Sequence, residues 1–81
     1  MSRMSVQAYI LAQTEVGKAA DVANAIAAIE GVGEAVDVTG PYDVIVRAGA
    51  ANVDDLGALV ISKGQAVPGI TRTLTCPIVS L

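Results

Sequence analysis

The chain has 81 residues, enough for one domain, and 53% of them are hydrophobic although only Tyr9 and Tyr42 are aromatic. The chain has five Lys or Arg residues and eight Asp or Glu residues, which gives a net charge of -3. This charge argues against direct binding to nucleic acid, because phosphate binding needs clustered cations. The absence of His and the single Cys exclude a His-based catalytic centre, a disulfide framework and a Cys/His zinc site.

The N-terminal residues contain one cation and no continuous apolar segment, so they do not resemble a signal peptide. The chain also lacks the ~20 consecutive apolar residues that a membrane-spanning helix needs. We therefore expect a cytoplasmic protein without contact with a membrane. Ala, Val, Ile and Leu are nevertheless more abundant than one small core can bury, which predicts an obligate oligomer.

The first half of the chain predicts a strand, a helix and a second strand. Residues Val6–Thr14 alternate between the two faces of a strand, whereas Lys18–Glu30 is rich in Ala and carries Val and Ile at helical spacing. Gly31 stands where a helix favours a left-handed C-terminal cap. The following run, Val32–Thr39, alternates again, which places Val32, Val36 and Val38 on one side of the second strand.

The second half predicts a strand, a helix and a last strand. Gly40-Pro41 is a turn signal, and the β-prone run Tyr42–Ala48 predicts a strand that forms a hairpin with the preceding one. Asn52 is the predicted N-cap of the second helix, whose core-facing stripe comprises Leu56, Leu59, Val60 and Val67. Pro68-Gly69 ends this helix. The last strand, Ile70–Val79, carries three threonines that point the same way, Thr71, Thr73 and Thr75.

The order β-α-β-β-α-β predicts an α+β fold, a ferredoxin-like sandwich with both helices on one face of an antiparallel sheet. A weak internal repeat supports this fold, because the segment around Gly31 realigns with the segment around Gly69 at an offset of 38 residues. The other face of the sheet keeps apolar residues that need a cover, among them Tyr9, Leu11 and Ile45. We expect one domain over residues 1–81.

Residue types that carry out catalysis are scarce. Glu34 and Asp37 have no base, nucleophile or metal ligand near them in the sequence, so we expect solvated charges there. Cys76 is expected to be a small buried hydrophobe, since nothing around it in the sequence activates a thiol. The sequence therefore predicts no catalytic residue, no metal site and no cofactor.

The predicted hairpin at Thr39–Asp43 offers a different chemistry. It places a glycine, an aromatic ring and a carboxylate at the mouth of two strands. The carboxylate of Asp43 could hold an ammonium group and the turn N–H groups could hold a carboxylate, which are the two ends of a free amino acid. The alternative is a tight turn in which Asp43 bonds the backbone of its own loop.

The run Thr39-Gly40-Pro41-Tyr42-Asp43, followed by Val-Ile-Val-Arg, resembles the Gly-x-Tyr/Phe-Asp signature in the effector domain of Lrp/AsnC transcription regulators. Residues Gln65–Thr73 resemble that domain's helix–Pro-Gly–strand ending, although Gly64 replaces the larger apolar residue usual before the glutamine. The resemblance covers nearly the whole chain but not the helix-turn-helix that usually precedes this domain. It implies a stand-alone effector domain that does not bind DNA itself.

The resemblance also implies an assembly and a site. Domains of this family pair sheet to sheet as dimeric α/β barrels, associate into higher oligomers, commonly octamers, and bind amino acids in a cleft between dimers. The implied function is a non-enzymatic amino-acid sensor that modulates transcription through partners such as full-length Lrp/AsnC regulators. Carried over to this chain, the ligand-binding residues are Gly40, Tyr42, Asp43, Gln65, Thr73 and Thr75.

Two other functions are compatible with the sequence. Small cofactor-independent monooxygenases form the same kind of ferredoxin-like dimer, although the lack of His and Trp disfavours that reaction here. The other is a purely structural assembly module that binds no ligand. An amino-acid sensor would respond to its effector with a change in size distribution, whereas a scaffold would not.

Overall fold

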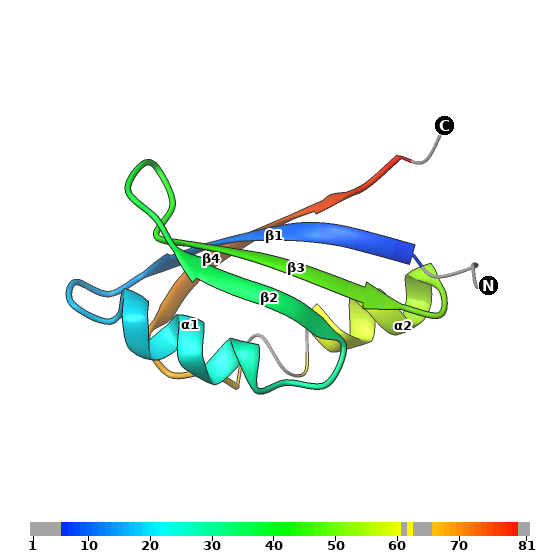
Figure 1. Cartoon of the computed structure of the whole chain (residues 1–81), viewed down its shortest axis with the longest axis horizontal. Coiled ribbons are helices and arrows are strands. Elements are labelled where there is room, and N and C mark those ends of the chain that lie inside the picture. Colours follow the sequence, from blue (N-terminus) through cyan, green and yellow to red (C-terminus); the bar gives the residue numbers. More distant parts are fainter. Residues whose placement is uncertain (1–5, 61, 63–65, 80–81) are drawn as a thin grey trace.

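The computed structural model describes residues 6–60, 62 and 66–79 and confirms the predicted order of elements. The strands form an antiparallel sheet in the order β2-β3-β1-β4, and both helices lie against the same face of it (Figure 1). This is the predicted α+β, ferredoxin-like fold. The elements are β1 (Val6–Thr14), α1 (Ala19–Ala27), β2 (Val32–Asp37), β3 (Val44–Ala50), α2 (Val53–Leu59) and β4 (Ile70–Pro77).

Local hydrogen bonds explain where the helices begin and end. Asn52 caps α2 as predicted, because its side-chain oxygen accepts a hydrogen bond of 2.8 Å from the backbone N–H of Asp55. α1 ends at Ala27, three residues earlier than predicted. The chain tightens there, since the N–H of Ile29 donates to the carbonyl of Ile26 at 2.9 Å, a spacing of three residues in place of the helical four.

The hairpin between β2 and β3 is confirmed, but its loop is longer than the tight turn predicted from Gly40-Pro41. β2 ends at Asp37 and β3 begins at Val44. The N–H of Val38 donates to the carbonyl of Asp43 at 2.8 Å, and this bond closes a loop over residues 38–43. The connection between β2 and β3 is therefore a loop over residues 38–43 at the end of the sheet.

Two predicted ends in the second half also differ. Val67, predicted as part of the helical stripe, lies beyond α2, although its side chain still packs against the core. β4 ends at Pro77, two residues earlier than predicted, although the N–H of Ile78 still donates to the carbonyl of Gln7 at 2.8 Å. The hydrophobic pattern thus correctly placed Val67 against the core but assigned it to the wrong element.

The core between the sheet and the helices is built from small side chains. Among the described residues, the largest fully buried side chains are valines. Each such residue removes little apolar area from water, so the hydrophobic stabilisation per residue is modest. The buried hydrophobic residues are Ala8, Ala12, Val22, Ala23, Ile26, Val44, Val46, Ala48 and Leu56.

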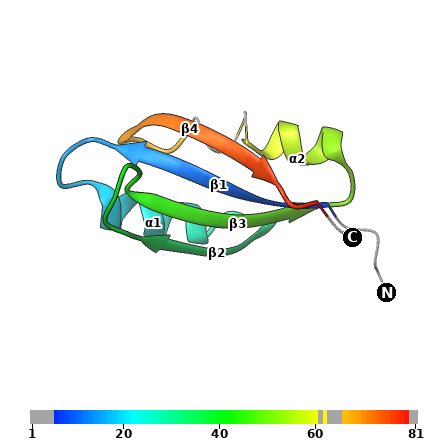
Figure 2. The ribbon, with the colours of Figure 1, turned by 90° about the horizontal axis from the view of Figure 1, so that it is seen from above.

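The face of the sheet opposite the helices has no covering element among the described residues, and we call it the open face. Figure 2 looks onto this face, with the strands in front and the helices behind them. The side chains of Tyr9, Leu11 and Ile45 belong to it, as predicted, because the alternate residues of the same strands form the core.

One predicted alternation is wrong. Val32 and Val36 lie on opposite faces of β2, because the pairing with β3 shifts register between Val32 and Glu34. The extra residue is Gly33, which makes a β-bulge. Val32 therefore packs against the core, whereas Val36 belongs to the open face and is 43% exposed.

The internal repeat predicted from the sequence has a counterpart in the backbone. Gly31 and Gly69, the two glycines that the repeat aligns, both have left-handed conformations, with φ of 96° and 97°. Each stands just before a strand, β2 or β4. A Cβ on Gly69 would lie 3.2 Å from Cγ2 of Val22 on α1, so the close approach of this turn to the helix also requires glycine.

Candidate functional site

The hairpin signature lies at one end of the sheet. Gly40, Tyr42 and Asp43 belong to the 38–43 loop, which rises from the sheet on the side opposite the helices (Figure 1). Gly40 is exposed, whereas Tyr42 and Asp43 are half-buried. The structure thus brings these three predicted residues together.

Asp43 anchors the loop to the end of β1. Its carboxylate oxygen Oδ2 accepts a hydrogen bond of 2.8 Å from the N–H of Thr14, and its own N–H donates to the carbonyl of Ala12 at 2.9 Å. The side chain of Gln13 adds a bond of 3.1 Å from Nε2 to the carbonyl of Pro41. The carboxylate therefore bonds the backbone of β1, whereas the alternative predicted a bond to the backbone of its own loop.

Thr73 and Thr75 lie on the other face of the sheet. They pair with Ala12 and Ile10 of β1, whose side chains face the helices, so both threonines face the helices too. Thr73 also borders an apolar cavity of about 30 Å³ between the sheet and the helices. Gln65 lies outside the described residues.

The predicted site residues are consequently separated within one chain. The loop stands on the open face, whereas the two threonines face the helix layer. One copy of the chain does not bring both groups into a single pocket. A ligand that contacts both groups has to lie between copies.

The open face carries an apolar row that crosses the sheet from edge to edge. The pairing aligns Val36 with Ile45, Ile45 with Leu11 and Leu11 with Leu74. We call these four residues the apolar belt. Val36 and Leu74 are 43% and 46% exposed, and Tyr9 beside the belt is 43% exposed. The belt and Tyr9 therefore form a continuous apolar strip on the open face.

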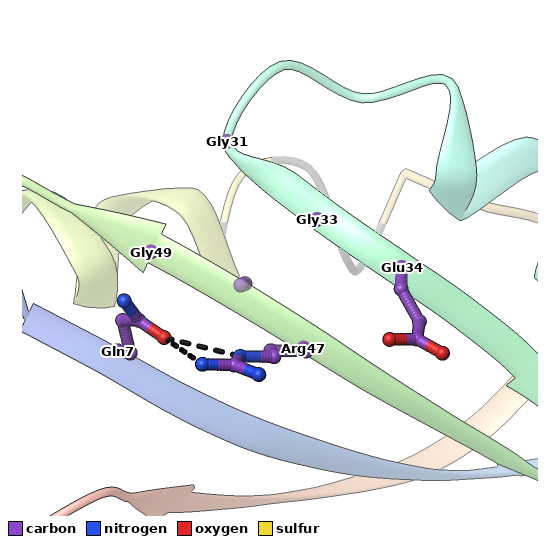
Figure 3. Close-up of a pocket in the computed structure, with 7 residues that line it drawn as sticks. Gln7, Gly31, Gly33, Glu34, Arg47 and Gly49 are labelled. Atoms are coloured by element: carbon purple, nitrogen blue, oxygen red, sulfur yellow. Dashed lines mark hydrogen bonds between the residues drawn. The ribbon is translucent and has the colours of Figure 1, made fainter.

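A hollow at the other end of the open face was not predicted from the sequence. It is a depression of about 400 Å³ beside Arg47, with Gln7 on one side and Glu34 on the other (Figure 3). Its remaining lining comes from Gly31, Gly33, Ala48 and Gly49. These residues come from three segments that are separated in the sequence, and the pairing of β1, β2 and β3 brings the segments together.

Charged and sulfur-containing side chains do not build a metal centre in the part of the chain that the structure describes. In these residues, no group of three or more His, Cys, Asp or Glu side chains is arranged so that it could hold a metal ion.

Glu34 and Asp37 are exposed, as predicted. The prediction for Cys76 is wrong: its side chain is exposed, because it pairs with Tyr9 on the open face of the edge strand β4.

None of the described helices is long and apolar enough to cross a membrane. Residues 7–80 match a protein family described as the Lrp/AsnC ligand binding domain. A curated relative, an uncharacterized HTH-type transcriptional regulator of Pyrococcus furiosus, is 38% identical over 55 residues, which are 68% of this chain and 37% of that protein. The chain thus spans just over a third of that relative's length.

Two solved structures are similar to this chain over nearly their whole length. A hypothetical protein of Pyrococcus horikoshii has a TM-score of 0.86 and 33% identity, over 94% of this chain and 92% of that one. The protein FFRP-DM1 has a TM-score of 0.85 and 34% identity, over 91% of this chain and 99% of that one. Since the family match also covers most of the chain, the protein belongs to the Lrp/AsnC ligand-binding domain family.

Proposed function

We propose that this chain is a non-enzymatic regulatory domain that binds a free amino acid and modulates transcription through partner regulators. Membership of a family of ligand-binding domains supports the binding role. The observation that carries the proposal is the apolar belt on the open face, because it gives the domain a surface for pairing with another copy.

Pairing is proposed to occur through the open faces of two copies. Burial of Val36, Ile45, Leu11 and Leu74 against the same residues of a second copy removes apolar area from water that the chain's own helices leave exposed. Such a self-complementary patch suits a two-fold dimer. Dimers are then proposed to associate further, with an octamer as the expected assembly.

The amino-acid site is proposed to lie between dimers. Gly40, Tyr42 and Asp43 supply one wall, and Thr73 and Thr75, together with Gln65, supply another. Because Asp43 already bonds the N–H of Thr14, we assign it mainly the task of holding the loop in position. Tyr42 and the loop N–H groups are then the direct contacts. A ligand shared between dimers shifts the assembly only by binding one arrangement more tightly than another.

Sedimentation tests the assembly. We expect wild type to sediment as a dimer or larger species and Leu11→Glu to sediment as a monomer, because the substitution places a charge in the middle of the belt. Val53→Glu is the matched control, since Val53 lies on α2 and is already 69% exposed. A wild-type monomer, or equal dissociation of both variants, contradicts the proposed interface.

Calorimetry against the free amino acids tests the ligand. At least one amino acid is expected to bind, and Tyr42→Ala to weaken its binding about ten-fold or more, which corresponds to about 1.4 kcal/mol. Asp37→Ala serves as the control at an exposed position near the loop. If no amino acid binds while the protein still assembles, the ligand-free assembly module is the better description.

A further inference from the structure

The end of β1 connects the 38–43 loop to the helix side of the sheet. Two successive residues, Thr14 and Glu15, donate their backbone N–H groups to different neighbours at this end of the sheet (Figure 1). The N–H of Thr14 donates to Oδ2 of Asp43, and the N–H of Glu15 donates to the carbonyl of Gly69 just before β4, each at 2.8 Å. The loop and the turn before β4 are therefore bonded to adjacent peptide groups.

Little conformational freedom separates these two hydrogen bonds. Because peptide groups are planar, only the φ and ψ angles of Thr14 lie between its N–H and the N–H of Glu15. Thr14 is the last residue of β1 and pairs with Ile70 of β4, which restricts both angles. A displacement of the loop that moves the carboxylate of Asp43 therefore also turns the peptide group that bonds Gly69.

Glu15 bonds the start of α1 as well. Its carbonyl accepts a hydrogen bond of 3.0 Å from the N–H of Lys18, which is the N-cap of α1. The turn at Gly69 lies directly against the same helix, since a Cβ there would lie 3.3 Å from Cβ of Lys18 and 3.2 Å from Cγ2 of Val22. Glu15 thus holds the turn before β4 and the start of α1 in a fixed relation.

These two elements form the walls of a groove of about 550 Å³, which we call the α1 groove. Lys18 and Ala25 line one wall and Val67 and Pro68 the other, and the bonded pair Glu15 and Gly69 joins the two walls. The groove lies on the helix layer. Pairing of two copies through their open faces leaves this layer uncovered.

We propose that Thr14 and Glu15 transmit the position of the 38–43 loop to the α1 groove. The bond from Thr14 to Asp43 is the element with two states, intact or broken. When the loop moves and breaks it, the turn at Gly69 shifts relative to α1, and the width of the groove changes. As a route for an amino-acid signal, this inference rests on the proposed function. It carries that signal to a face that a partner regulator can reach while two copies are paired.

Hydrogen exchange of single amides, followed by NMR on the 81-residue chain at one protein concentration, tests this link. Asp43→Ala removes the acceptor of the Thr14 bond. We expect the amide of Glu15 to exchange about ten-fold faster or more, and the amide resonances of Val67 and Gly69 to shift. Leu56 on α2 is expected to keep its exchange rate, because α2 takes no part in the link.

Two further variants at the loop calibrate this result. Asp43→Asn keeps a neutral acceptor, so its effect on Glu15 should be smaller than that of Asp43→Ala. Asp37→Ala is the matched control, since Asp37 is an exposed aspartate at the end of β2, where the same loop begins. It should leave the exchange of Glu15 unchanged. Circular dichroism verifies that each variant folds.

The link should also act in the reverse direction, because coupling between two sites is reciprocal. Gly69→Ala displaces the turn from Val22, and we expect it to shift the amide resonances of Thr14 and Asp43. Gly57→Ala is its control, because a Cβ on Gly57 has open space, and it should shift neither. If Gly69→Ala does not fold, the two Asp43 variants decide the question.

Three results would overturn the link. These are an unchanged exchange rate of Glu15 in Asp43→Ala, an equal acceleration at Leu56, which indicates a global loss of stability, and an equal acceleration in Asp37→Ala. The exchange measurement uses no ligand. A failure of every amino acid to bind in calorimetry therefore contradicts the proposed function but leaves these rates unaffected, so the two proposals fail independently.

Discussion

Replacement of Asp43 by Ala tests the structural role of this residue in holding the loop. The substitution removes the acceptor of the 2.8 Å bond from Thr14 and leaves that part-buried N–H without its partner. A lost bond to a charged acceptor costs about 1.5–3 kcal/mol, and partial exposure lowers the expected loss to about 1–2 kcal/mol. Asp43→Asn keeps a neutral acceptor and should lose roughly half as much.

Urea denaturation followed by circular dichroism measures these losses. Protein concentration is held fixed, because assembly contributes to apparent stability. For a domain of this size, a loss of 1–2 kcal/mol corresponds to a decrease in Tm of about 5–15 °C. Asp37→Ala is the control, since Asp37 is an exposed aspartate at the end of β2. If Asp43→Ala costs no more than this control, the bond to Thr14 does not hold the loop and the assigned role of Asp43 is wrong.

Two further stability predictions concern the core and the turn before β4. Val46→Ala, at a position only 1% exposed, should cost about 2 kcal/mol in urea denaturation, whereas Val53→Ala at 69% exposure should stay within about 0.5 kcal/mol. Equal effects would contradict the assignment of the core. Gly69→Ala should cost about 1–3 kcal/mol, because φ is 97° and the new Cβ meets Val22 at 3.2 Å. Gly57→Ala on α2, where a Cβ has open space, should instead stabilise by about 0.5–1 kcal/mol.

The fold could be predicted because hydrophobic period and turn residues agree along the chain. The alternation in β1, the cap at Asn52 and the repeat around Gly31 and Gly69 each specify local structure that the tertiary contacts then preserve. Two errors have physical causes that local patterns do not contain. The bulge at Gly33 inserts one residue and reverses the faces of Val32 and Val36. α1 ends where tighter turns replace the helical spacing.

The candidate sites were predictable only in part. The hairpin residues are adjacent in the sequence, so their proximity could be predicted, but the bond from Thr14 to Asp43 spans 29 positions and depends on the pairing of β1 with β3. The depression beside Arg47 depends even more on this pairing, since Gln7 and Arg47 are 40 positions apart. Exposure of Cys76 likewise follows from the place of β4 at the sheet edge.

The bulge in β2 places the two valines of one short edge strand on different surfaces. Without it, strict alternation would place Val32 and Val36 on the same face, so the two valines could either seal the core or extend the belt, but not both. An insertion of a single glycine gives each valine its own side of the sheet. In a chain with more aliphatic residues than its small core can bury, this arrangement leaves apolar side chains available for contact with a second molecule.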